Sequence, residues 1–299
     1  MNEKKSQKIA IIVHGGAWSI PEYMAKDSIK GADYAARIGW DILLNGGSAL
    51  DAVEKTVNCM EENPIFDAGI GAALNEKGNI ELDAIIIDGT TLNTGAVAGV
   101  KNIIHTVSLA RIIMEKTEHV FVIGEGANLI GRDNGFEEIS EKELISEYAL
   151  NEWKQFKFKG AVNTFYNVDT VGAVALDSTG NIATATSTGG ITGKKIGRVG
   201  DSPIIGAGAF ADSKIGGVSA TGHGESILKV MLARNAIEKL KQGLSPQEAA
   251  EISLQEMNSR VNGNGGLIIL DNQGNVGFHF TTEKMVWAYI KDDKLISGI

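Results

Sequence analysis

The sequence predicts an α+β fold in which strands near both ends of the chain flank paired helices. Residues 9–13 form a short apolar run that is typical of a buried strand. Residues 170–187 and 266–280 each have the pattern of two strands around a tight turn. Two helical patterns, residues 225–241 and 245–261, lie between these hairpins. This order favours a layered α+β domain.

The N-terminal half contains further local signals. The strand at 9–13 should end in a turn at the glycine pair 15–16. A helix is predicted over 27–45, with the glycine pair 46–47 ending it. The motif from Ser48 to Asp51 then starts a helix that runs to about residue 62. The other predicted elements of this half are a strand over 79–88, a helix over 107–116 and a strand over 120–123.

Residues 131–169 have a different character. Ser140 and the charged residues after it can open a short helix, whereas 154–167 mix Lys, Phe, Asn and Tyr without a clear period. We therefore predict that the second half of this stretch is a surface connector. An ordinary loop between two strands explains the same pattern equally well.

The C-terminal half has the clearest turn and capping signals. The hairpins turn at residues 178–180 and 272–274, which contain Gly, Asn, Ser and Thr. The helix at 245–261 begins with Ser245 and Glu248 as a capping box and has Pro246 in its first turn.

Composition excludes several classes of protein. The chain has 299 residues, 43% of them hydrophobic, which is ample for a packed core. Its net charge of −9 argues against nucleic acid or an acidic membrane surface as a partner. Cys59 is the only cysteine, and the five His lack metal-ligand spacing, so a catalytic transition metal is not expected. The apolar run 9–13 is too short for a signal peptide or a membrane span, so we expect a cytoplasmic protein.

Thr170 is the first residue of an apolar strand and directly follows Asp169. Thr is a good strand former, so this residue alone would favour a purely structural role. Other polar motifs follow it downstream, however. They are Thr186-Ser-Thr-Gly-Gly, Gly197-Arg-Val-Gly-Asp-Ser-Pro and Thr221-Gly. No Gly-x-Ser-x-Gly elbow accompanies them, so a Ser-His-Asp triad has little support.

Together these motifs resemble the β-subunit signature of plant-type L-asparaginases, or isoaspartyl peptidases, which are N-terminal nucleophile hydrolases. The resemblance extends to the N-terminal half and covers nearly the whole chain, apart from about thirty residues before Asp169. The N-terminal motifs that carry it lie at 14–17, 66–71, 81–84, 94–100 and 123–127.

The resemblance implies a four-layer αββα sandwich that is cut between Asp169 and Thr170. Residues 1–169 would then form the α-subunit part, with a linker at about 132–169, and residues 170–299 the β-subunit part. Together the two parts would form one domain, and two such pairs would associate as (αβ)₂. A connector directly upstream of the nucleophile fits a linker that the protein cleaves itself.

The proposed cut would also activate the nucleophile. An alcohol is weakly nucleophilic at neutral pH and needs a base. Attack of the Thr170 hydroxyl on the Asp169 carbonyl gives an ester, and hydrolysis of that ester frees the Thr170 α-amine. Such an amine has an unperturbed pKa of about 7.7–8.0 and can accept the hydroxyl proton.

The resemblance assigns the remaining catalytic and substrate-binding roles. Thr188 would orient the nucleophile, while Thr221 and Gly222 would form the oxyanion hole and contact the substrate. Arg198 and Asp201 would hold the substrate's free α-carboxylate and α-amine. Each set also has a plain structural explanation: a cross-strand Thr pair, a loop turn and a surface salt bridge.

The resemblance implies no cofactor for catalysis and a structural sodium ion bound by backbone carbonyls in residues 60–70. The residues of that loop are Met60, Glu61, Asn63, Phe66, Ala68 and Ile70. Oxygen ligands suit a hard cation, although a glycine-rich loop without any ion would have the same sequence. His14 lies in a strand-end motif and is expected to support the site rather than to act in acid–base chemistry.

Two residues depart from the usual family pattern. Asp67 stands where the family usually has Asn, and Asp169 where many members have Gly. Asp-Thr is the pattern of the related glycosylasparaginases and of threonine aspartase. We predict hydrolysis of L-asparagine to aspartate and ammonia, and cleavage of β-aspartyl dipeptides. The alternatives are a glycosylasparaginase, a threonine endoprotease, or an uncleaved, inactive precursor that acts as a binding protein.

Overall fold

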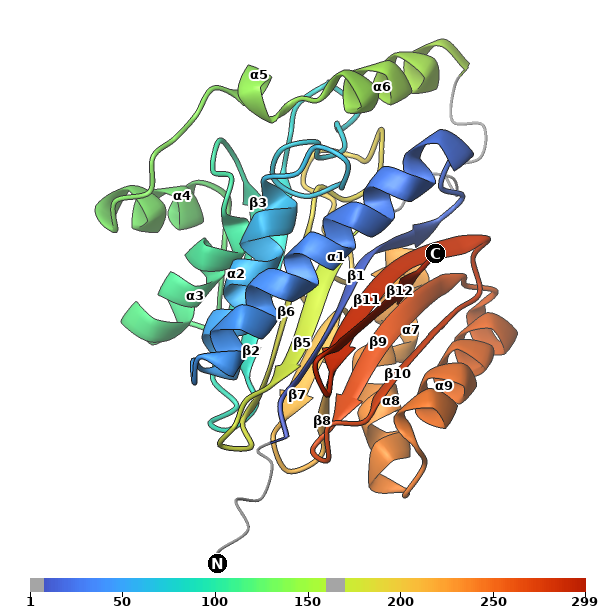
Figure 1. The fold of residues 1–299 in the computed structure, drawn as a ribbon. Coiled ribbons are helices and arrows are strands. Elements are labelled where there is room, and N and C mark those ends of the chain that lie inside the picture. The colour runs from blue at the N-terminus through green and yellow to red at the C-terminus, as the bar shows by residue number, and fades with distance from the viewer. Residues whose placement is uncertain (1–7, 160–169) are drawn as a thin grey trace, which may run out of the picture.

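The computed structural model describes residues 8–159 and 170–299, which form two β-sheets packed face to face with helices on the outside (Figure 1). In the larger sheet, β3 and β4 run parallel and the other neighbouring strands run antiparallel. The order of its strands is β12 (Lys294–Gly298), β11 (Lys284–Lys291), β1 (Ala10–Trp18), β5 (Val171–Leu176), β6 (Ile182–Thr188), β2 (Leu82–Asp88), β3 (Thr94–Val100) and β4 (Phe121–Ile123).

The smaller sheet is antiparallel and comes entirely from the C-terminal half. Its order is β10 (Val276–Phe280), β9 (Gly265–Asp271), β8 (Gly216–Gly222) and β7 (Ala209–Asp212).

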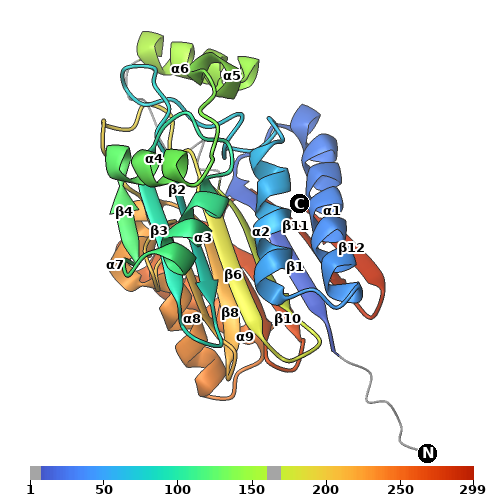
Figure 2. The ribbon, with the colours of Figure 1, turned by 90° about the vertical axis from the view of Figure 1, so that its left-hand side faces the viewer.

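The helices divide between the two outer faces and one end of the molecule. Before the gap in the described chain they are α1 (Glu22–Leu44), α2 (Ala49–Glu61), α3 (Thr106–Lys116), α4 (Gly124–Asp133), α5 (Glu141–Leu144) and α6 (Glu147–Lys159). After it they are α7 (Gly224–Val230), α8 (Leu232–Lys241) and α9 (Pro246–Val261). Both views place α5 and α6 at one end of the molecule, beyond the ends of the strands (Figures 1 and 2).

Strand alternation divides the apolar residues among three buried clusters. Ile11 packs with the helices α1 to α3, whereas its neighbour Ile12 packs between the two sheets. In the smaller sheet, Ile268 faces the larger sheet and Ile269 faces the helices α7 to α9. Each fully buried side chain of this size contributes about 1.5–3 kcal/mol.

The mixed α/β character and most predicted elements are confirmed. Both hairpins form, with β5 paired to β6 and β9 paired to β10. Ser48 accepts a hydrogen bond from the backbone N–H of Asp51 at the start of α2. Ser245 and Glu248 form the predicted capping box of α9. Strands β3, β7, β8, β11 and β12 were not predicted.

The turn predicted at residues 15–16 is wrong. Strand β1 continues through both glycines to Trp18 and pairs with β5 as far as Gly15. Its register against β11 shifts between His14 and Ala17, so the glycine pair forms a bulge rather than a turn. A bulge keeps the strand within the sheet, and the turn signal could not distinguish the two.

Two other predictions also need correction. The single helix predicted at 225–241 is broken at Met231, which has a left-handed φ of 50° and separates α7 from α8. The predicted connector is helical up to residue 159, because α6 occupies 147–159. The rest of the connector, including Asp169, lies outside the described residues.

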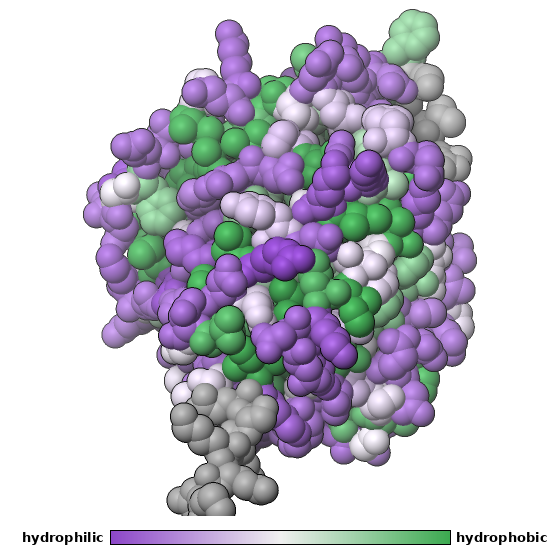
Figure 3. Space-filling view, in the orientation of Figure 1, coloured by the Kyte–Doolittle hydropathy of each residue, from purple (hydrophilic) through white to green (hydrophobic). Residues whose placement is uncertain are grey.

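The molecular surface is mainly polar on the face shown in Figure 3, with apolar side chains scattered between charged ones. Within residues 8–159 and 170–299, no helix combines the length and the apolar character needed to cross a membrane.

The close packing of α1 depends on Gly39. A Cβ atom at this position would lie 2.2 Å from Cδ1 of Ile11 and 2.3 Å from Oγ1 of Thr56. Gly39→Ala should therefore lower the free energy of unfolding by about 1–3 kcal/mol, measured by chemical denaturation. Gly126→Ala in α4 is the matched control, because its nearest atom would be 3.4 Å away, and it should be neutral or stabilising by up to about 1 kcal/mol. Equal stability of the two variants would contradict this packing argument.

Candidate active site

Thr170 and Thr188 are in contact at the ends of neighbouring strands. The register of β5 and β6 pairs Val171 with Ser187, so the next residues outward are Thr170 and Thr188. Thr170 Oγ1 donates a hydrogen bond to Thr188 Oγ1 at 3.2 Å. Thr188 Oγ1 also accepts from the backbone N–H of Gly190 at 2.9 Å. Both threonines are buried, so their hydroxyls are held in a defined geometry away from bulk water.

A buried polar layer connects the two sheets below these threonines. Ser219 Oγ of β8 lies 2.8 Å from His14 Nε2 of β1 and 2.8 Å from Thr186 Oγ1 of β6. The sheets approach closely here because Gly172 has no side chain. A Cβ at Gly172 would lie 2.0 Å from Ser219 Oγ.

Thr221 lies two residues beyond Ser219 on β8. Because side chains alternate along a strand, Thr221 and Ser219 point to the same face of β8. Thr170 and Gly172 are likewise two residues apart at the start of β5. The close pair of Gly172 and Ser219 therefore brings Thr221 to the level of Thr170. Thr221 is fully buried, and its Oγ1 has no hydrogen-bond partner within the described residues.

Gly222 follows Thr221 with a φ of +133°, in the range that favours glycine. A Cβ there would also lie 2.3 Å from the Cα of Gly265 on the neighbouring strand. Glycine is therefore required at this position, and the backbone can approach a bound molecule closely.

His14 is a structural member of the site. Burial lowers its pKa to about 3, although a backbone interaction with Thr170 opposes this shift. The imidazole is therefore neutral at pH 7 and is unsuited to exchange protons there. This supports the expected structural role of His14.

Arg198 has a partner that the sequence analysis did not identify. Its Nε and Nη2 donate two hydrogen bonds to the carboxylate of Glu225, at 3.0 and 2.9 Å. Partial burial alone would raise the pKa of Glu225, but the hydrogen bonds from Arg198 hold it below its usual value. Glu225 thus fixes one edge of the guanidinium and leaves the Nη1 edge for another group.

Asp201 is buried beside Arg198. A Cβ at Gly224 would lie 2.7 Å from Arg198 Nη2 and 2.9 Å from Asp201 Oδ1, so the two charged groups converge at the start of α7. Burial raises the pKa of Asp201 to about 7. Its Oδ2 has no hydrogen-bond partner in the part of the chain that the structure describes. A cation placed here would supply the missing partner.

The loop that contains Asp67 contacts Gly189, which follows strand β6. Asp67 Oδ1 accepts from the N–H of Ala73 at 2.6 Å, and the Asp67 carbonyl accepts from the N–H of Gly189 at 3.0 Å. Asp67 therefore has a hydrogen-bonding role in this loop. Removal from solvent raises the pKa of its carboxyl.

The loop is compatible with a hard cation bound by carbonyl groups. The carbonyls of Glu61 and Asn63 accept backbone hydrogen bonds from Ile70 and Phe66, and a carbonyl oxygen has a second lone pair. Among the described residues, no three His, Cys, Asp or Glu side chains gather in a way that could hold a metal ion.

The sequence motifs thus located five of the polar groups that converge here, in Thr170, Thr188, Thr221, Arg198 and Asp201. They did not assign roles to Ser219, Thr186 or Glu225. Thr186 begins one of the quoted motifs, two residues before Thr188, and Glu225 lies four residues beyond Thr221. The signal for Ser219 is its spacing of two residues from Thr221, and this spacing is informative only if both residues are known to lie on strand β8.

The polar layer gives a test of its contribution to stability. Ser219→Ala removes the partner of both His14 Nε2 and Thr186 Oγ1, which should cost about 1–3 kcal/mol of unfolding free energy. Ser253→Ala is the matched control, because this equally buried serine in α9 has an Oγ without a partner in the described chain. The control should be neutral or stabilising in the same thermal or chemical denaturation. A Ser219→Ala variant as stable as the wild type would refute a structural role for the layer.

Comparison with known proteins supplies independent evidence. A family model described as Asparaginase matches residues 7–298 of the chain. A protein of Xenopus laevis named isoaspartyl peptidase/L-asparaginase is 48% identical over 98% of this chain and 95% of its own length.

The human protein of the same name is 47% identical over 97% of this chain and 95% of its own length. A protein of Drosophila pseudoobscura named as a probable isoaspartyl peptidase/L-asparaginase is 38% identical over the same shares. The similarity therefore spans both sheets and all the residues of the candidate site.

Proposed function

The chain belongs to the asparaginase family, and on that premise we propose that it hydrolyses L-asparagine to aspartate and ammonia and cleaves β-aspartyl dipeptides. The observation that carries this function is the buried contact between Thr170 and Thr188. It is accompanied by a hydroxyl of Thr221 and a carboxylate oxygen of Asp201 that have no hydrogen-bond partner among the described residues. A nucleophile, a donor and a cation-binding carboxylate together suit an amino acid with a reactive side-chain amide.

The proposed architecture is the four-layer αββα sandwich of N-terminal nucleophile hydrolases. Two sheets packed face to face, with helices on their outer faces, support it. In the proposal, residues 1–169 become the α part and 170–299 the β part, with a linker at about 132–169. Strand β1 of the first part pairs with β5 of the second, so the parts would remain associated after cleavage.

Maturation would begin with attack of Thr170 Oγ1 on the carbonyl of Asp169. The amide bond between the two residues breaks, an ester forms, and the α-amine of Thr170 takes up a proton as it leaves. Water then hydrolyses the ester, which releases Asp169 with a free carboxylate and restores the hydroxyl. Thr188 would orient the attacking oxygen throughout.

Turnover would repeat the same chemistry on a substrate. The neutral α-amine of Thr170 accepts the hydroxyl proton while Oγ1 attacks the side-chain carbonyl of asparagine. Thr221 Oγ1 and the backbone N–H of Gly222 would stabilise the negative oxygen. Donors of this kind each contribute about 10²–10³ in rate. The proton passes to the leaving ammonia or amine, and water hydrolyses the acyl-enzyme.

Recognition would rest on the two charged groups at the start of α7. The Nη1 edge of Arg198 would bind the α-carboxylate, with the opposite edge held by Glu225. Asp201 would bind the α-ammonium through the oxygen that has no partner among the described residues. A glycosylasparaginase would use the same clamp but needs space for a sugar beyond the amide.

The remaining parts of the proposal concern assembly and environment. Two αβ pairs would associate as (αβ)₂ in the cytoplasm. A sodium ion held by the carbonyls of residues 60–70 would stabilise the loop that carries Asp67. In this proposal no cofactor takes part in the chemistry.

The first functional prediction concerns maturation. Thr170→Ala lacks the attacking hydroxyl, so it should remain a single full-length chain without amidase activity, as measured by intact mass and ammonia release. Thr170→Ser is the matched control and should still split, because it keeps the hydroxyl, although its freer χ1 should slow the step. Cleavage between residues 169 and 170 in the Ala variant would exclude autocatalysis. An intact wild-type chain would instead favour the inactive binding protein.

The second concerns the pH dependence of recognition. Burial raises the pKa of Asp201 to about 7, so its charged form predominates above that pH and is lost progressively as pH falls through it. The wild-type kcat/KM for asparagine should therefore rise between pH 6 and 8. Asp201→Asn should lose about 2–5 kcal/mol of transition-state binding at pH 8. It should also lose the part of the rise that belongs to Asp201 and keep the part that belongs to the Thr170 α-amine, whose unperturbed pKa is about 7.7–8.0.

Asp27→Asn on exposed α1 is the control and should leave the profile unchanged. Asparagine blocked at both its α-amine and α-carboxylate should be hydrolysed very poorly by the wild type. Rapid hydrolysis of that compound would refute the clamp and favour an endoprotease.

A further inference from the structure

The loop of residues 190–197 connects the two ends of the candidate site and has no role in the function proposed so far. It begins two residues after Thr188, which contacts the candidate nucleophile, and it ends just before Arg198. No helix or strand of the described chain includes these residues. The contacts of the loop with other segments therefore determine where both of its ends lie.

Backbone hydrogen bonds hold the middle of this loop against residues 74–81. The N–H of Gly193 donates to the carbonyl of Leu74 at 2.7 Å. The N–H of Glu76 donates to the carbonyl of Lys194 at 2.8 Å. The two segments are thus joined in both directions.

Helix α6 packs against the same two segments. A Cβ at Gly193 would lie 2.3 Å from the ring of Phe156, and Trp153 Nε1 donates to the carbonyl of Asn75 at 2.8 Å. These contacts leave the loop little room to shift, so a side chain that fixes one of its ends also fixes the site residue next to that end.

Lys194 supports the end of the loop next to Thr188. It is a lysine that is only 2% exposed, and its Nζ donates to the carbonyl of Glu81 at 2.7 Å. A Cβ at Gly190 would lie 2.9 Å from Cδ and 3.0 Å from Nζ of Lys194. The N–H of Gly190 donates to Thr188 Oγ1 at 2.9 Å. The lysine side chain therefore packs against the residue that fixes the Thr188 hydroxyl.

Glu81 supports the other end of the loop. Both of its carboxylate oxygens accept from the N–H of Gly197 at 3.2 Å, and Oε2 also accepts from Asn75 Nδ2 at 3.2 Å. Gly197 has a left-handed φ of +76° and directly precedes Arg198. The carboxylate thus fixes the backbone from which the Arg198 guanidinium extends.

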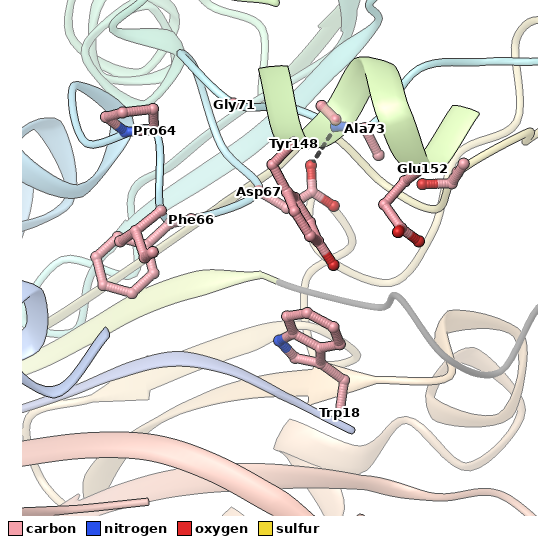
Figure 4. Close-up of a pocket in the computed structure, with 11 residues that line it drawn as sticks. Trp18, Pro64, Phe66, Asp67, Gly71, Ala73, Tyr148 and Glu152 are labelled. Carbon is pink, nitrogen blue, oxygen red and sulfur yellow. Dashed lines mark hydrogen bonds between the residues drawn. The ribbon is translucent and has the colours of Figure 1, made fainter. Parts of the chain in front are cut away.

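The charges near Lys194 are consistent with its burial. Burial lowers the pKa of its ammonium, and the nearby carboxylates oppose that shift. These carboxylates belong to Asp83, Glu81 and Asp67. The carboxylate of Asp67 is itself held by the N–H of Ala73 (Figure 4). A buried cation among fixed anions is an oriented group, because moving it would leave charges without compensation.

We propose that each end of this loop is held by a positioning residue for the reaction. Lys194 positions the hydroxyl of Thr188, through the turn at Gly190. Glu81 positions the guanidinium of Arg198, through the backbone that precedes it. This inference rests on the proposed function and deepens it, because the two residues serve different steps of the same reaction.

The first variant is Lys194→Met, which keeps much of the side-chain length but not the ammonium. It should lower kcat for L-asparagine by about 10–100-fold and leave KM unchanged within about twofold. The reason is that a displaced Thr188 misorients Thr170 without altering the clamp. Maturation, followed by intact mass, should also be slower, because it uses the same pair of hydroxyls.

The second variant, Glu81→Ala, should have the opposite kinetic signature. It removes the acceptor of the Gly197 N–H but keeps the backbone carbonyl that binds Lys194. KM for L-asparagine should rise by about tenfold or more, while kcat should change by less than about threefold. Maturation should proceed at the wild-type rate, because the scissile bond has no free α-carboxylate for Arg198 to bind.

The matched control is Lys195→Met, which removes the neighbouring lysine. Its side chain is 82% exposed and pairs with Glu76 at the surface. Such a pair contributes little, so this variant should change neither kcat, KM nor maturation.

Wild-type kcat and maturation in Lys194→Met, or a wild-type KM in Glu81→Ala, would overturn the corresponding assignment. Parallel losses of kcat, KM and stability in both variants would also overturn the proposal, because they would show only general support of the fold. If Lys194→Met fails to fold, Lys194→Met/Asp83→Asn decides the question, because it removes both buried charges and should show the same loss of kcat. Absence of asparagine hydrolysis by the wild type would instead overturn the proposed function.

Discussion

The hydrogen-bonded layer of His14, Ser219 and Thr186 sets the geometry on which the rest of the site depends. These three side chains come from different strands of two facing sheets and are fully buried. Buried polar groups are costly unless they are paired, so the hydrogen bonds of this layer stabilise the observed register between the sheets. That register puts Thr221 of the smaller sheet at the level of Thr170 and Thr188 of the larger one. An apolar layer would allow the sheets to slide with less penalty.

Two polar groups of the site beyond this layer differ from it, because they lack hydrogen-bond partners among the described residues. Thr221 Oγ1 and Asp201 Oδ2 are buried without partners among the described residues, and such groups typically cost about 1–3 kcal/mol each. A fold that has satisfied the adjacent hydroxyls could have satisfied these as well. Thr221 lies at the level of Thr170 and Asp201 lies beside Arg198, which fits the contacts with a substrate that are proposed above. The free energy lost in the empty protein strengthens binding when a substrate supplies the missing partners.

Sequence reasoning succeeded where the signal is local and failed where it depends on packing between distant segments. The capping box at Ser245 and the hairpin of β5 and β6 follow from neighbouring residues. The glycine pair 15–16 looks like a turn because only the flanking strands β5 and β11 keep β1 extended through it. Met231 interrupts a good helical pattern with a left-handed φ that no residue in the sequence indicates. The pairing of Arg198 with Glu225 was missed because the two residues are 27 positions apart.

That pairing also bears on the selectivity of the proposed clamp. Glu225 is 44% exposed and Arg198 is 14% exposed, so the pair spans the boundary between solvent and the buried site. The carboxylate partly neutralises the guanidinium and fixes its plane, and a planar fork that is already oriented loses less entropy when it binds. Asp201 Oδ2 has no hydrogen-bond partner among the described residues, and burial raises the pKa of Asp201 to about 7. In the proposed clamp, an arriving α-ammonium would favour the ionised carboxylate of Asp201. A ligand with only a carboxylate would not supply this partner, so the proposed clamp would favour free amino acids over simple acids.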